Sequence, residues 1–143
     1  MPNSLTVYAP ASIGNFSVGF DALGLALAPM DGTLLGDLVQ LRPFSPREQG
    51  GNWKLELNGP FADALPADQE ENVVIESCRA FQQAAIQAGV EIERLQVLLS
   101  TRLQICSGMV YIARSIVAAI EAFNRFHGNP LKTRQFVGFM ARR

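Results

Sequence analysis

Two stretches with apolar residues at helical spacing, separated by a strand-like segment, constrain the fold more than any other feature of this chain. The segment between them, residues 91–99, has a core-like apolar end at Val97, Leu98 and Leu99. Each helical stretch stops at a glycine, Gly89 or Gly128, as helices commonly do. The apolar stripes consist of Val74, Cys78, Phe81, Ala85 and Ala88 in the first stretch, and Ala113, Ile116, Val117, Ile120 and Phe123 in the second.

Short alternating patterns predict strands elsewhere in the chain. Residues 53–57 alternate apolar and polar side chains, which predicts a half-buried antiparallel strand. Asp68, three residues before Glu71, is a possible cap for the first helix. The patterns also predict strands at residues 5–8 and 38–42 and a third helix at 134–140.

Composition excludes several classes of protein. The chain has 143 residues, 48% hydrophobic residues and a net charge of −1, which is typical of a single globular domain. It has no basic patch for nucleic acid, no apolar run of membrane-spanning length and no signal-peptide pattern, so we expect a cytoplasmic protein. Cys78, Cys106 and His127 are too few for a zinc site or a disulfide scaffold, and buried free thiols are expected instead.

An amide and a carboxylate lie six positions apart in a glycine-rich loop. Asn15 and Asp21 would suit a small zwitterionic or hydroxylated substrate, because a carboxylate can hold an ammonium group and an amide can fix other polar atoms. An alternative is structural: Asn15 would form an Asx turn and Asp21 would cap a helix beginning near Ala22.

The same loop carries a resemblance. Residues 8–24 contain Ala-Pro followed by Ser-x-x-Asn-x-x-x-Gly-Phe-Asp-x-x-Gly, which resembles the N-terminal signature of homoserine kinases in the galactokinase/homoserine/mevalonate (GHMP) kinase superfamily. The resemblance implies an α+β fold, a ribosomal-protein-S5-like N-terminal domain over residues 1–143. It also implies that this domain is truncated near its C-terminal end and that the ferredoxin-like C-terminal domain is missing. It also implies transfer of the ATP γ-phosphoryl group to L-homoserine in threonine biosynthesis, with Asn15 and Asp21 binding homoserine.

A second segment suggests where a nucleotide would bind. Glu71-Asn72-Val73-Val74 resembles a Glu-Asn-Ile-Val segment of the family, in which the Asn reaches the adenine of ATP. The alternative for Asn72 is helix capping, and one side chain can serve both roles.

The segment 104–113 departs from the family's phosphate loop. Where the family has Pro-Ile-Gly-Ser-Gly-Leu-Gly-Ser-Ser-Ala, this chain keeps Ser107 and Gly108 as candidate nucleotide contacts. Two glycines are replaced by Cys106 and Val110, two serines by Tyr111 and Ile112, and the proline by Gln104. These changes remove backbone freedom and the hydroxyl that helps hold Mg²⁺, so binding of ATP and Mg²⁺ is expected to be weak or absent.

Other readings of the chain stay open. Arg142 falls where the family has the glutamate that completes the magnesium site, and a cation there would repel the metal. The alternatives to an active kinase are a non-catalytic fragment or pseudokinase that keeps the substrate loop, or a sequence altered by a frameshift or by engineering. A thiol catalytic pair of Cys106 and His127 is disfavoured because no orienting acid is evident. The sequence leaves open whether the domain forms a homodimer.

Overall fold

A computed structural model describes residues 2–14, 24–44, 51–66, 68–103 and 111–132. Residues 134–140, the predicted third helix, lie outside this set. In chain order the elements are β1 (Leu5–Pro10), β2 (Ser12–Ile13), β3 (Leu25–Ala26), β4 (Gly36–Pro43), β5 (Trp53–Asn58), the short 3₁₀ turns η2 (Ala62–Ala64) and η3 (Gln69–Glu71), α1 (Val73–Gln87), β6 (Leu95–Thr101) and α2 (Tyr111–Phe126).

Four strands form one mixed sheet in the order β1-β4-β6-β5, and β2 pairs with β3 separately. β4 is antiparallel to both β1 and β6, whereas β5 and β6 are parallel. The prediction of an antiparallel strand at residues 53–57 was therefore wrong in its pairing, although its half-buried pattern is confirmed. Helix α1 connects β5 to β6 and returns the chain to the same end of the sheet, so the two strands run in one direction.

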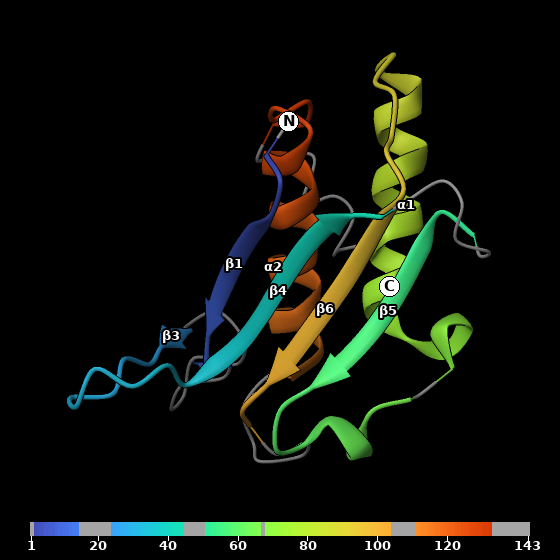
Figure 1. Cartoon of the computed structure of the whole chain (residues 1–143). Helices are drawn as coiled ribbons and strands as arrows, with labels where there is room; N and C mark the ends of the chain where they lie inside the picture. The colour runs from blue at the N-terminus through green and yellow to red at the C-terminus, as the bar shows by residue number, and fades with distance from the viewer. Residues whose placement is uncertain (1, 15–23, 45–50, 67, 104–110, 133–143) are drawn as a thin grey trace.

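Both helices lie on one face of the sheet (Figure 1). Alternate residues of β4 and β6, such as Val39, Leu41, Val97 and Leu99, are fully buried against them. Phe123 of α2 lies at the centre of this core. Its ring is 4.8 Å from that of Trp53 in an edge-on arrangement, and 5.8 Å from that of Phe81.

The opposite face of the sheet is largely polar. Gln96 donates to Glu56 across β6 and β5 at 2.6 Å, and Arg42 donates to Gln40 along β4 at 2.7 Å. Leu98 belongs to this face and is only partly buried, which corrects its assignment to the core. In a strand, successive side chains point to opposite faces, so Leu98 cannot share the buried face of Val97 and Leu99.

Several predicted boundaries shift by a few residues. Asn72, not Asp68, caps α1. The Asp68 carboxylate, just before η3, instead accepts a hydrogen bond from the Glu70 amide at 2.9 Å. β6 begins at Leu95 rather than near Glu91. Two members of the predicted stripes, Ala88 and Val117, are exposed, because the helix faces that pack on the sheet are narrower than the apolar pattern.

His127 and Cys78 are both buried in the fold. The His127 Nδ1 atom lies 2.8 Å from the Phe123 carbonyl oxygen, and Nε2 accepts from the Glu93 amide at 3.4 Å. The two contacts fit a neutral imidazole protonated on Nδ1. Cys78 is buried, as predicted, and burial raises the pKa of its thiol well above its ordinary value. Cys106 lies outside the described residues.

Three strands of the four-stranded sheet end at the same end of it. β1, β5 and β6 all point toward the lower end of the sheet in Figure 1, where β4 and α2 begin. Ala9, Asp37 and Thr101 are neighbours there across three strands. Gly59, just after β5, packs so closely on this end that a Cβ would lie 2.3 Å from the Thr101 carbonyl oxygen. Loops that are far apart in the sequence therefore start side by side.

Candidate functional site

The candidate site is the end of the sheet at which β1, β5 and β6 terminate. Four of the five site residues predicted from the sequence, Asn15, Asp21, Ser107 and Gly108, lie outside the described residues. What the structure describes is the framework on either side of the two loops that contain them.

The loop with Asn15 and Asp21 is closed at its base by a short β-ladder. Ser12 pairs with Ala26 and Ile13 with Leu25 in antiparallel register. The Leu27 amide donates to the Ala11 carbonyl at 2.8 Å, which extends the closure. Both ends of the segment are therefore fixed next to the end of β1.

Asn72 is held at the start of α1. Its Oδ1 atom accepts from the Val74 amide at 3.0 Å, its Nδ2 atom donates to the Pro66 carbonyl at 3.5 Å, and the residue is buried. Capping by Asn72 is thus confirmed. Contact with a nucleotide remains a prediction, and it would use an amide whose two ends already have partners.

A buried carboxylate with several hydrogen-bond partners lies at this end of the sheet, on a residue that the sequence analysis did not select. Asp37, at the start of β4, is fully buried. Its Oδ1 atom accepts from the Thr101 hydroxyl at 2.9 Å, and Oδ2 accepts from the Ser115 hydroxyl at 2.8 Å. Arg114 approaches the same Oδ2 with Nε at 3.4 Å and is itself buried. We call these four residues the Asp37 cluster.

The Asp37 cluster joins three elements at the two ends of segment 104–110. Thr101 is the last residue of β6, Arg114 and Ser115 lie in the first turns of α2, and Asp37 lies between them on β4. The only sequence signal was a charged residue directly before the apolar residues of a strand. That signal does not reveal burial, because charged residues at strand ends are usually exposed.

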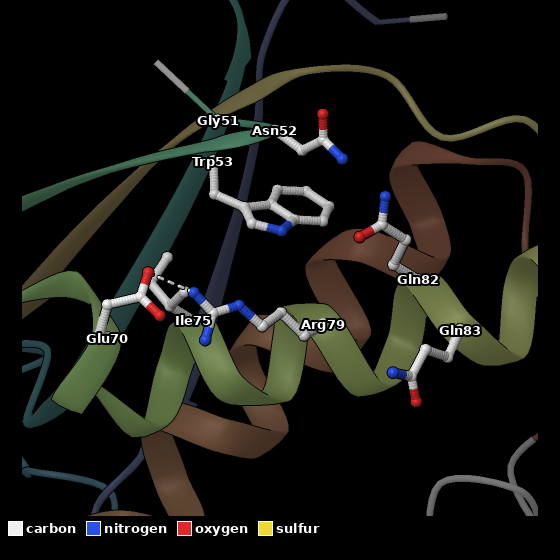
Figure 2. A pocket seen from close by; sticks show the side chains of 8 residues that line it. All are labelled: Gly51, Asn52, Trp53, Glu70, Ile75, Arg79, Gln82 and Gln83. Atoms are coloured by element: carbon white, nitrogen blue, oxygen red, sulfur yellow. Dashed lines mark hydrogen bonds and ion pairs between the residues drawn. The ribbon is translucent and has the colours of Figure 1, made fainter.

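The described residues also contain a surface cavity of about 370 Å³ beside α1. Arg79 and Glu70 form an ion pair of 2.5 Å along one side of it, with the Trp53 indole between the start of β5 and the helix (Figure 2). It contains none of the predicted site residues. Its lining consists of Gly51, Asn52, Trp53, Glu70, Ile75, Arg79, Gln82 and Gln83.

Neither a metal cluster nor a membrane span is found in the described part of the chain. No group of three or more His, Cys, Asp or Glu side chains there could hold a metal ion. No helix among those residues is long and apolar enough to cross a membrane.

Comparison with known proteins shows which solved structures this chain is similar to. The sequence matches no protein-family model. A crystal structure of homoserine kinase from Cytophaga hutchinsonii superimposes with a TM-score of 0.76 and 29% identity, covering 97% of this chain and 40% of that one. The chain is similar to homoserine kinases. The resemblance predicted from residues 8–24 is thereby confirmed.

A second structure supports the fold alone. The structure of a putative homoserine kinase from Listeria monocytogenes superimposes with a TM-score of 0.58 and 23% identity. The match covers 92% of this chain and 40% of the Listeria chain. The chain thus spans 40% of the length of each of these two proteins. The α+β fold class is confirmed, while the ribosomal-protein-S5-like assignment, the domain limits and the missing C-terminal domain remain predictions.

Proposed function

We propose that this chain is part of a homoserine kinase-type phosphotransferase, which transfers the γ-phosphoryl group of ATP to the side-chain hydroxyl of L-homoserine in threonine biosynthesis. The observation that carries the proposal is similarity to the homoserine kinase of Cytophaga hutchinsonii over 97% of this chain. The chain spans 40% of that enzyme, so the activity of a whole protein is part of the proposal.

Homoserine binding is assigned to Asn15 and Asp21. The Asp21 carboxylate would pair with the substrate ammonium and the Asn15 amide would orient its polar atoms. Support comes from the closure of this loop by β2 and β3 at the end of the sheet where segment 104–110 also begins. Substrate and phosphoryl donor would then meet at one end of the domain, and catalysis would rest mainly on positioning.

The nucleotide side is assigned to Asn72, Ser107 and Gly108, with a weakened phosphate site. Helix α2 begins at Tyr111, so Tyr111 and Ile112, which replace the two family serines, occupy its first turn. An isoleucine supplies no oxygen to Mg²⁺, so Ile112 does not fit the magnesium-holding role of the family serine that it replaces. We therefore expect little phosphoryl transfer by this chain.

A non-catalytic amino-acid-binding protein is the second candidate, and the same first turn of α2 favours it. The two candidates differ in one measurable property. A kinase requires Mg-ATP affinity and homoserine-dependent release of ADP, whereas the non-catalytic protein requires homoserine binding alone.

Calorimetric titration with L-homoserine tests the substrate assignment. Asp21→Ala should weaken homoserine binding by about tenfold or more, because it removes a charged hydrogen-bond partner. Asn72→Ala should weaken homoserine binding less. Asp31→Ala is the matched control: it removes an exposed carboxylate with the same change in net charge, and Asp31 bonds only within its own turn to Thr33 in the described structure. Equal effects of Asp21→Ala and Asp31→Ala would remove the basis for the assignment.

Titration with Mg-ATP tests the nucleotide side. The unmodified chain should bind Mg-ATP weakly or not at all. A loop-restored variant carrying Cys106→Gly, Val110→Gly, Tyr111→Ser and Ile112→Ser should bind it measurably, because backbone freedom and hydroxyl oxygens return. Failure of this folded variant to bind Mg-ATP would favour the non-catalytic candidate.

A further inference from the structure

The two hydroxyls of the Asp37 cluster flank the segment that departs from the family. Thr101 lies three residues before residue 104, and Ser115 lies five residues after residue 110. Their hydroxyls reach different oxygens of one carboxylate, at 2.9 Å and 2.8 Å. A single buried side chain from β4 therefore connects the residues before and after the segment.

Neither hydroxyl needs Asp37 to satisfy its own hydrogen bonding. A serine within a helix commonly donates to the backbone carbonyl four residues earlier. Ser77 of α1 does so, donating to the Val73 carbonyl at 2.7 Å. Ser115 donates to Asp37 instead. Thr101 also has the Leu103 carbonyl within reach at 3.3 Å, but its contact with Asp37 is the shorter one.

Charge explains why an aspartate suits this position. A carboxylate only accepts hydrogen bonds, so it can serve both hydroxyls and the Arg114 guanidinium together, whereas an amide would direct N–H groups toward one of these donors. Arg114 compensates the buried charge from the first turn of α2. A simpler interpretation is that Asp37 only neutralises Arg114, and that interpretation predicts little effect from removing the hydroxyls.

We propose that Asp37 is a positioning residue that fixes the end of β6 relative to the first turns of α2 through Thr101 and Ser115. It thereby sets the separation between the two ends of segment 104–110, to which the proposed function assigns the nucleotide phosphates. The positioning of Thr101 and Ser115 by Asp37 is argued from the described residues alone. The role of Asp37 toward a nucleotide rests on the proposed function.

Amide hydrogen exchange of the intact chain, followed by mass spectrometry, tests the positioning role. Thr101→Val and Ser115→Ala should each raise exchange about tenfold in peptides that cover residues 102–103 and 111–116, with little change in α1. Thr101→Ser should keep the protection, because it keeps the hydroxyl. Ser77→Ala is the matched control, since it removes a buried hydroxyl bond outside the Asp37 cluster.

These variants leave the Asp37 carboxylate and its ion pair with Arg114 in place, so a change in exchange reports the two hydroxyl contacts. Exchange that is unchanged at both ends of the segment, or raised equally in α1 and α2, would overturn the positioning role. A second measurement adds Thr101→Val to the loop-restored variant. Mg-ATP affinity should then fall about tenfold while homoserine affinity stays unchanged; parallel losses would indicate a merely structural role. If the loop-restored variant does not bind Mg-ATP, the nucleotide assignment fails, while hydrogen exchange still decides the role of Asp37.

Discussion

Removing Arg114 should destabilise the fold far more than removing an exposed arginine of the same helix. The Arg114 Nε and Asp37 Oδ2 atoms are 3.4 Å apart and both side chains are buried. Two unit charges at that distance attract each other by about 5 kcal/mol at an effective dielectric constant of about 20. Arg114→Met leaves the buried carboxylate without its countercharge, so we expect a loss of about 3–5 kcal/mol in the free energy of unfolding.

An exposed ion pair of α2 provides the control. Arg125 and Glu121 are 2.6 Å apart, but their side chains are 58% and 32% exposed. Water screens such a pair, so Arg125→Met should cost less than about 1 kcal/mol. Breaking the shorter pair should thus lower the free energy of unfolding less than breaking the longer one, because burial matters more here than the distance between the charges.

A double-mutant cycle isolates the interaction from loss of packing. Asp37→Asn combined with Arg114→Met removes both charges, and its destabilisation should be smaller than the sum of the single effects by about 2 kcal/mol or more. Urea unfolding followed by circular dichroism gives these values, provided that the slopes agree among variants. If Arg114→Met prevents folding, Arg114→Lys keeps the cation and should fold. Additive single effects, or a loss no larger than that of Arg125→Met, would refute the reasoning.

Three further predictions concern the core, the cap and pH. Phe123→Ala should lower the free energy of unfolding by about 3–5 kcal/mol, because the ring is fully buried against Trp53 and Phe81. Val117→Ala, at an exposed position, should change it by less than about 0.5 kcal/mol. Urea unfolding measures both values, and similar losses would contradict the packing. Asn72→Ala should cost about 1 kcal/mol through loss of the cap, and Asn72→Ser should recover most of it in thermal unfolding; no difference between the two would argue against capping. Burial raises the pKa of the Cys78 thiol, so the unfolded chain loses this proton at lower pH than the folded chain. The free energy of unfolding should therefore fall as pH rises above the ordinary thiol pKa of 9.0. Cys78→Ala should reduce this alkaline loss of stability, and a loss that persists unchanged would point to other groups.

Local sequence patterns predicted most elements but not how they pair. The stripes at 74–88 and 113–123 correspond to α1 and α2, and the alternation at 53–57 corresponds to β5. Alternation reports that one face of a strand is buried, whereas strand direction depends on which neighbour it meets. β5 pairs with β6, more than thirty residues away, and the pattern carries no information about that contact.

The candidate site shows the same division. Asn72 was selected because its segment resembles one of the family, and capping was its alternative role. That alternative could be weighed from the sequence because capping is a local interaction with an amide two residues away. Asp37 was not identified, because its partners lie 64 and 78 residues further along the chain. Only the fold brings those hydroxyls to one carboxylate.

The sequence by itself determined α1, α2, most strands, the buried thiol of Cys78 and the resemblance to homoserine kinases, because periodicity, turn residues and motif spelling are properties of neighbouring residues. The tertiary structure alone decided that β5 runs parallel to β6, that Leu98 faces away from the core, and that Asp37, Thr101 and Ser115 meet at one end of the sheet. These features depend on strand order and burial, which arise only when distant segments pack together and exclude water from the groups between them.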